Sequence, residues 1–124
     1  QIYYDVIMRE RKGEYLGKGK QVDVHLGTFD APLFAVMNTK AKSMELEFDG
    51  ETATAKLEVS GGKPGERVLR FDLLNSRRRR LLDRGANVLT RKGAASWTPE
   101  GRLPKNGTLV CRDVATGVGA EVQL

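Results

Sequence analysis

The chain has few of the residues on which most enzyme and metal chemistry depends. Its 124 residues include one cysteine, Cys111, and one histidine, His25. A single cysteine excludes an internal disulfide, and one cysteine with one histidine cannot supply a closed zinc site. The default interpretation of Cys111 is a buried, unreactive thiol. We therefore expect no metal and no cofactor, and we assign no catalytic residue.

Long apolar runs and a secretion signal are also absent from the sequence. No stretch approaches the roughly 20 apolar residues that a membrane helix needs, so we expect no membrane partner. The chain begins with Gln1 instead of methionine, and we expect that it was processed or cut from a longer protein. An intracellular or virion-associated location fits this interpretation.

The most informative pattern is the alternation of apolar and polar residues on both sides of Asp49-Gly50. Met44–Phe48 and Thr52–Val59 both follow period two, which predicts a β-hairpin with one buried face. A two-residue turn at Asp49-Gly50 would set Leu46 opposite Ala53 and Met44 opposite Ala55.

A third strand, Glu66–Leu74, follows the glycine-rich loop at 61–65. Because its apolar positions continue the same face, the sequence predicts a three-stranded antiparallel meander. The expected pairs are Leu57 with Leu69, Ala55 with Phe71, and Ala53 with Leu73. Ala53 and Ala55 would then be buried in the central strand, where their small size lets bulkier neighbours interdigitate.

The rest of the chain gives weaker patterns, and the whole predicts one mainly β domain over 1–124. That domain is an antiparallel sheet or a small barrel or sandwich, with a short N-terminal helix and one or two helical turns near 77–89. Residues 1–20 form its N-terminal helical segment, and 21–124 form a β-rich body with a basic loop region at 75–107. The expected elements are a helix at Tyr3–Lys12, strands at Gln21–Phe29 and Leu33–Met37, helical turns within Ser76–Leu89, a loop at Arg91–Gly107, and a hairpin of Thr108–Val114 with Val118–Leu124.

The net charge of +5 is concentrated in one segment. Asn75–Lys105 carries nine basic and two acidic residues, whereas the rest of the chain carries twelve basic and fourteen acidic residues. Such asymmetry indicates either a polyanionic partner or an acidic protein partner. The alternative is a solvated, flexible face that binds nothing.

Four consecutive arginines make this segment the main candidate for a binding site. Guanidinium groups suit phosphate through paired hydrogen bonds, and a tryptophan nearby could stack on a base. Aromatic residues are otherwise sparse there, so a platform for single strands is not evident. The candidate residues for binding nucleic acid or another polyanion are Arg77, Arg78, Arg79, Arg80, Arg84, Arg91, Lys92 and Trp97.

The N-terminal segment resembles part of CTP synthase. The resemblance rests on Ile2-Tyr3, Asp5-Val6, Glu10–Lys18, and Gln21-Val22 with His25. In that family the segment is a helix, a tight turn with glycine and a strand of the amidoligase domain, near nucleotide-binding and subunit contacts. The resemblance implies nucleotide contacts for Gln21, Val22 and His25.

The resemblance is limited to about the first 25 residues. The family has a proline where this chain has Val24, and its glycine-rich phosphate loop is absent here. Its glutaminase domain, with a cysteine nucleophile and a histidine base, has no room in 124 residues.

These observations leave three hypotheses. The first is a non-enzymatic structural, assembly or protein-interaction module, of the kind found in viruses and phages, with a protein partner or a second copy of itself. The second is a nucleic-acid-binding domain that uses residues 77–92. The third is a fragment related to CTP synthase that binds a nucleotide.

Overall fold

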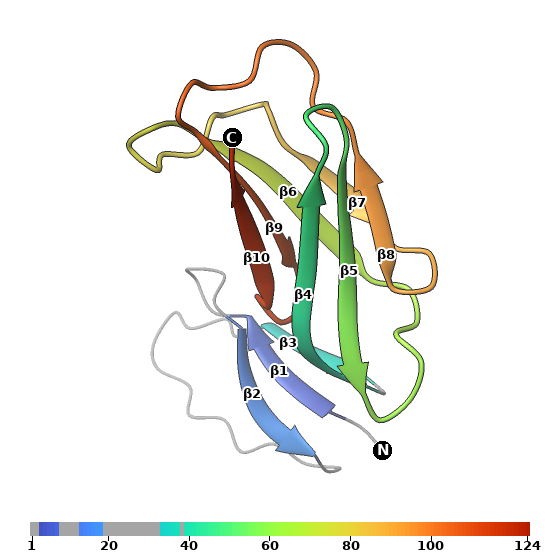
Figure 1. Ribbon diagram of the computed structural model, residues 1–124. Coiled ribbons are helices and arrows are strands. Elements are labelled where there is room, and N and C mark those ends of the chain that lie inside the picture. Colours follow the sequence, from blue (N-terminus) through green and yellow to red (C-terminus); the bar gives the residue numbers. More distant parts are fainter. Residues whose placement is uncertain (1–2, 8–12, 19–32, 38) are drawn as a thin grey trace, which may run out of the picture.

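The computed structural model describes residues 3–7, 13–18, 33–37 and 39–124. In these residues it contains ten strands in three antiparallel sheets (Figure 1). No helix in the described ranges has the length and apolar character needed to cross a membrane. The prediction of a mainly β fold is therefore confirmed.

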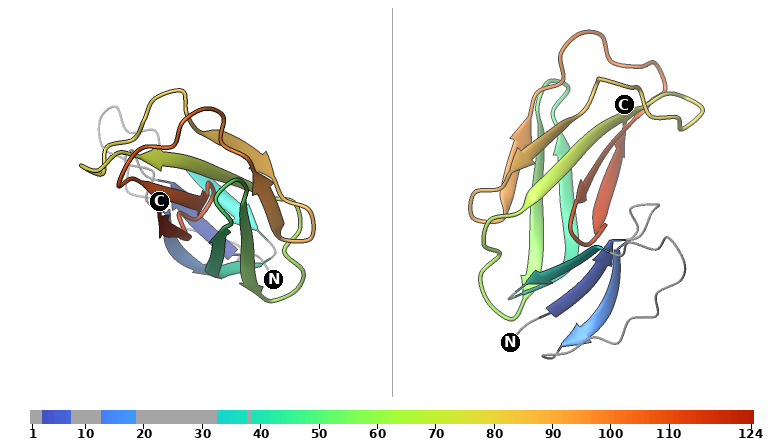
Figure 2. Two further views of the ribbon diagram at one scale, coloured as in Figure 1. Left: turned by 45° about the horizontal axis from the view of Figure 1, so that its top comes forward. Right: turned by 180° about the vertical axis from the view of Figure 1, so that it is seen from behind.

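Two of the sheets face each other as a sandwich (Figure 2). One has the order β10-β9-β6-β7, and the other has the order β4-β5-β8. At the sides of the sandwich β4 lies beside β10 and β7 lies beside β8, without closing a barrel. The strands are β4 (Lys40–Phe48), β5 (Ala53–Ser60), β6 (Val68–Leu74), β7 (Ala86–Leu89), β8 (Ala94–Trp97), β9 (Thr108–Asp113) and β10 (Gly119–Gln123).

The third sheet contains the N-terminal strands in the order β2-β1-β3, which are β2 (Gly13–Lys18), β1 (Tyr3–Ile7) and β3 (Leu33–Met37). The predicted strand at Leu33–Met37 is confirmed. The predicted helix at Tyr3–Lys12 is wrong for Tyr3–Ile7, which pairs with both neighbouring strands, and 8–12 lie outside the described residues. The predicted strand at Gln21–Phe29 also lies outside them.

The core of the sandwich comes from alternate positions of its central strands. In β5 the inward residues are Ala53, Ala55 and Leu57, with exposed fractions of 2% or less. In β6 the inward residues are fully buried, and β9 adds two more. The predicted burial of both alanines is thereby confirmed. The buried residues of β6 and β9 are Leu69, Phe71, Leu73, Leu109 and Cys111.

The β4–β5 hairpin is confirmed, but its register differs by two residues from the predicted one. Leu46 pairs with Ala55, and Phe48 pairs with Ala53. The connection has four residues instead of two, because the Asp49 side chain organises it. Its Oδ1 accepts hydrogen bonds from the backbone N–H groups of Glu51, at 2.8 Å, and Thr52, at 2.7 Å. A shift of two residues keeps every side chain on its predicted face.

The predicted three-stranded meander is wrong. The second neighbour of β5 is β8, and β6 belongs to the opposite sheet. Three glycines with positive φ, Gly61, Gly62 and Gly65, turn the chain between β5 and β6. The connection thereby crosses the distance between facing sheets, which is about 10 Å. The apolar faces of β5 and β6 still meet, across the core instead of along one sheet.

The helical turns predicted within Ser76–Leu89 are also wrong. The chain continues from β6 into a hairpin with β7, and Leu74 forms a bridge with Arg80. Arg78 and Asp83 have φ values of 60° and 59°, which an α-helix does not accommodate.

The loop predicted at Arg91–Gly107 is wrong for Ala94–Trp97, which form a strand, and the predicted final hairpin is confirmed. Residues predicted as the loop Arg91–Gly107 contain the short strand β8, and 98–107 form a loop. The final hairpin is confirmed as β9 and β10, which are connected through Ala115–Gly117.

Candidate interaction surface

The four consecutive arginines occupy the tip of the hairpin between β6 and β7, and we call Arg77–Arg80 the arginine tip. Asn75 builds this turn. Its Oδ1 accepts hydrogen bonds from the backbone N–H groups of Arg77, at 2.9 Å, and Arg79, at 3.0 Å. The N–H of Asn75 donates to the carbonyl of Arg79 at 2.9 Å. The turn is therefore held by the backbone and Asn75, which leaves the arginine side chains free for other contacts.

All four side chains of the arginine tip are exposed, and among the residues that the structure describes only Arg78 has an ion-pair partner. Arg78 donates two hydrogen bonds to the Glu121 carboxylate on β10, from Nη1 at 3.2 Å and from Nη2 at 2.8 Å. This hydrogen bonding lowers the pKa of Glu121. The side chains of Arg77, Arg79 and Arg80 make no hydrogen bond or ion pair with the described part of the chain. The tip thus presents three unpaired guanidinium groups.

Arg84 joins the hairpin to the loop 98–107. Its Nη2 donates to the carbonyl oxygens of Glu100, at 2.7 Å, and Arg102, at 2.9 Å. Its guanidinium is thus engaged in holding the loop. The loop itself presents the exposed side chains of Arg102 and Lys105, which have no ion pair within the described residues.

The loop 98–107 ends beside the arginine tip. Thr108 pairs with Leu74, and Leu74 forms a bridge with Arg80. Two steps across a sheet amount to about 10 Å, so Arg102 and Lys105 belong to the same end of the molecule as the tip. Neither was among the candidate site residues, although the charge excess of Asn75–Lys105 contained the signal.

Arg91 and Lys92 lie elsewhere. They form the turn between β7 and β8, where Arg91 exchanges backbone hydrogen bonds with Ala94. The neighbouring Thr90 bonds to Arg67 before the start of β6, whereas Arg80 lies beside the last residue of β6. The seven residues of β6 span about 23 Å, so Thr90 and Arg80 lie at opposite ends of this strand. The basic segment predicted at 77–92 therefore does not form one continuous surface.

Trp97 is part of the packing between the two sheets. Its side chain is half-buried, and its ring centroid lies 5.5 Å from that of the buried Phe71, with the rings tilted by 33°. The structure places this ring at the edge of the core, where it packs on Phe71.

The remaining candidates from the sequence are not gathered into a site. Cys111 is fully buried, and burial raises the pKa of its thiol to about 12. Gln21, Val22 and His25 lie outside the described residues. Within the ranges that the structure describes, no group of three or more histidine, cysteine or acidic side chains is placed to hold a metal ion.

The end of the sandwich that carries the arginine tip also carries acidic residues, at the β4–β5 connection (Figure 1). We call Glu47, Asp49 and Glu51 the acidic turn, and all three are exposed. The two backbone hydrogen bonds that Asp49 accepts lower the pKa of its carboxyl group. The hydroxyl groups of Thr52 and Thr98 lie 2.8 Å apart, which ties the acidic turn to the start of the loop 98–107.

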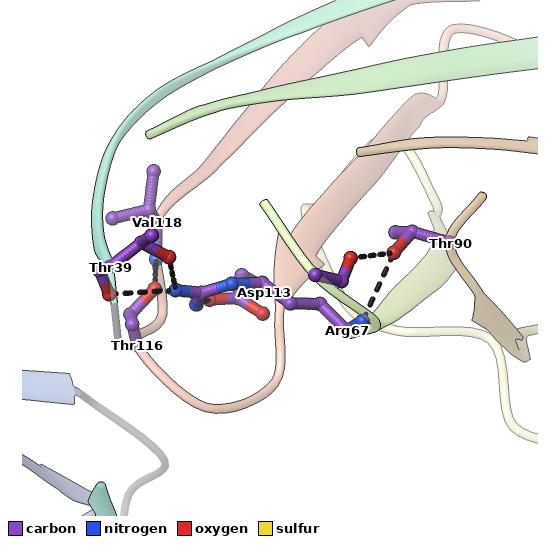
Figure 3. A network of polar contacts seen from close by, with 7 residues as sticks. Thr39, Arg67, Thr90, Asp113, Thr116 and Val118 are labelled. Carbon is purple, nitrogen blue, oxygen red and sulfur yellow. Dashed lines mark hydrogen bonds and ion pairs between the residues drawn. The ribbon is translucent and has the colours of Figure 1, made fainter. Parts of the chain in front are cut away.

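A buried polar network occupies the opposite end of the sandwich (Figure 3). Arg67 Nη1 donates to Asp113 Oδ2 at 2.7 Å, and both side chains are almost completely buried. Arg67 Nη2 donates to the carbonyl oxygen of Thr39 at 3.0 Å. Thr39 lies between β3 and β4, so the network fixes the junction of the N-terminal sheet with the sandwich. A hollow of about 270 Å³ lies beside it, lined by Met37, Thr39, Lys63, Pro64, Gly65, Glu66 and Arg67.

Comparison with known proteins finds no matching family, no similar curated protein and no similar solved structure. The resemblance to CTP synthase stays a prediction. Calorimetry with CTP and UTP tests it, and the absence of both heat and thermal stabilisation would contradict it.

Proposed function

We propose that the chain is a non-enzymatic assembly module that binds a protein partner through its charged end. The charged end is the end of the sandwich that carries the arginine tip, the acidic turn and the loop 98–107. The observation that carries this proposal is the set of guanidinium groups of Arg77, Arg79 and Arg80, which have no partner in the described part of the chain and stand on an ordered hairpin. Adjacent like charges repel one another and disfavour the compact state. Contact with carboxylates of a partner removes this repulsion.

The geometry of the arginine tip suits recognition of carboxylates. A guanidinium group binds a carboxylate through two parallel hydrogen bonds, as Arg78 does with Glu121. Because Asn75 holds the turn before any partner arrives, little conformational entropy of the backbone is lost on binding. Three further guanidinium groups at the same place can therefore recognise an acidic protein surface.

The rest of the described chain supports a binding role in preference to a catalytic one. The thiol of Cys111 is enclosed in the core, and the buried Arg67 and Asp113 bond to each other. The polar network around them holds strands together, and the charges at the other end are exposed on loops. Exposed charged loops on a rigid sandwich are suited to recognition.

A second candidate function is binding to the phosphate backbone of nucleic acid. It is favoured by Arg102 and Lys105, which place two more cations beside the arginine tip. If all five cations contacted phosphates, the slope of log Kobs against log salt concentration would be about −4.5 for duplex DNA. Because Trp97 packs on Phe71, such binding would read the backbone and not the bases.

The experiment that tests both functions removes the three unpaired charges of the tip. The variant Arg77→Ser/Arg79→Ser/Arg80→Ser keeps Asn75, Arg78 and Arg84, so that the turn and the loop stay in place. Fluorescence anisotropy would measure binding to polyglutamate, as a carboxylate probe, and to duplex DNA and RNA of matched charge.

We expect the triple variant to lose binding to polyglutamate at low salt. The matched control Arg91→Ser/Lys92→Ser removes charges from the other end of β7 and should bind like the wild type. Equal binding by the triple variant and the wild type would refute the role of the tip. Strong binding of duplex with none to polyglutamate would replace the first function by the second.

A further inference from the structure

The charge on the surface of the charged end changes sign from one side of that end to the other. The acidic turn lies on one side, with Glu47 and Glu51 unpaired among the described residues. The arginine tip lies on the other side. The loop 98–107 runs between them, tied to the acidic turn by Thr98 and to the β6–β7 hairpin by Arg84. Both charged regions thus have fixed positions on one surface.

We infer that the partner recognised by this end is a second copy of the same chain, related by a two-fold axis that passes near the loop 98–107. This inference rests on the proposed function and names its partner. A two-fold axis at the centre of a surface exchanges its two sides. The arginine tip of each copy would then lie against the acidic turn of the other.

The acidic turn is the reason to prefer a second copy over an unrelated acidic partner. A polyanion that covered this end would bring its negative charges against Glu47, Asp49 and Glu51, and such like-charge contacts are unfavourable. A second copy instead presents cations to those carboxylates. The same arrangement uses both signs of charge, whereas an acidic partner uses only one.

An apolar side chain accompanies the charges of the tip. Leu82 lies two residues after the last arginine of the tip and has an exposed fraction of 74%, the highest of the large apolar residues that the structure describes as exposed. Apolar groups at the centre of an interface, surrounded by a polar rim, are typical of specific protein contacts. Contact with a second copy would remove Leu82 from water.

Charge reversal gives a sharp test because the same surface of each copy forms both sides of the proposed interface. One variant, Arg77→Glu/Arg79→Glu/Arg80→Glu, makes both sides of the end acidic. The other variant, Glu47→Lys/Glu51→Lys, makes both sides basic. Asp49, Arg78 and Arg84 stay unchanged because their side chains hold the loops of this end in place.

Sedimentation velocity over a range of protein and salt concentrations would measure association. We expect the wild type to dimerise and its dimer fraction to fall as salt screens the contacts. Each charge-reversed variant alone should be monomeric, and a mixture of the two should form a dimer. Native mass spectrometry would show whether that dimer contains one copy of each variant.

A control variant, Lys63→Glu/Glu66→Lys, reverses two exposed charges near the opposite end and should dimerise like the wild type. Circular dichroism would verify that every variant is folded. A wild type that stays monomeric up to about 1 mM, where a contact worth about 4 kcal/mol would be visible, overturns the inference. A mixture of folded variants that stays monomeric also overturns it.

These results are separable from a failure of the proposed function. If the wild type is monomeric, and the variant with the neutralised tip no longer binds polyglutamate, then the tip binds a partner other than a second copy. If tip variants match the wild type in both association and polyanion binding, the proposed function fails together with the inference.

Discussion

Replacing Ala55 by leucine tests the packing of the two sheets directly. Ala55 is fully buried in the middle of β5, between Leu46 on β4 and Ala95 on β8. Leucine adds three carbon atoms where the facing β6 presents fully buried side chains, among them Phe71. The added apolar surface would favour folding by about 0.8 kcal/mol per carbon atom, provided that there were room for it. Without that room, overpacking destabilises the fold by about 1–3 kcal/mol.

Thermal and urea unfolding followed by circular dichroism would measure this effect. For a domain of this size we take about 4 °C per kcal/mol, which gives a fall in Tm of roughly 4–12 °C for Ala55→Leu. The matched control is Thr54→Leu, the next residue of the same strand, whose side chain is exposed on the outer face. Its stability should change by less than about 0.5 kcal/mol.

Two results would refute parts of this reasoning. A Tm for Ala55→Leu equal to that of the wild type would mean that space exists between the sheets at this position. Equal losses for Ala55→Leu and Thr54→Leu would mean that the outer face of β4-β5-β8 is covered by a partner. The second result would favour assembly through that face instead of through the charged end.

Three further predictions concern one glycine at a close approach between strands and two buried side chains. A Cβ atom at Gly85 would clash with the carbonyl oxygen of Phe71, so Gly85→Ala should destabilise the fold by about 1–3 kcal/mol in thermal unfolding. An unchanged Tm would contradict this close approach. Arg67→Met removes the ion-pair partner of the buried Asp113 carboxylate. It should lower the free energy of unfolding, measured in urea, by about 3–5 kcal/mol. A loss below about 1 kcal/mol would count against a structural role for the pair. Burial raises the pKa of the Cys111 thiol to about 12, from 9.0 when it is solvated; the unfolded chain therefore loses this proton first, and stability should fall as the pH rises from about 9 to about 12. Cys111→Ala should remove that part of the pH dependence, and an unchanged pH profile in this variant would contradict the assignment.

The sequence predicted the faces of the central strands better than their partners. Period two in residues 53–59 and in β6 identifies which side chains point inward, and all of the inward residues from Ala53 to Leu57 are buried. The same pattern is satisfied whether β6 continues the sheet of β5 or crosses to the facing sheet. Three glycines with positive φ make the crossing possible, and their φ values are not visible in a pattern of apolar residues. The β4–β5 register depended on one side chain, Asp49, which lengthens the turn.

The sequence identified only some of the cations at the charged end. The reason is again that a pattern of residues does not show which strands are neighbours. The charge excess identified the segment that contains the arginine tip. Which cations share a surface depends on the direction of short strands, and β7 and β8 have only four residues each. β7 carries Arg91 and Lys92 away from the tip, while the loop after β8 brings Arg102 and Lys105 back to it. Four-residue strands leave too little periodicity for this arrangement to be predicted.

The way in which Asn75 closes the hairpin separates what the tip contacts from what holds it together. Positions 77 and 79 contribute backbone N–H groups to the turn, and any residue except proline has such a group. Position 78, with φ near 60°, accepts glycine or asparagine most readily. The side chains of this turn can thus be exchanged while the sandwich below stays the same. Natural variation could retarget such a hairpin without a folding penalty, and a randomised library at 77, 79 and 80 would make it a scaffold for selecting new binders.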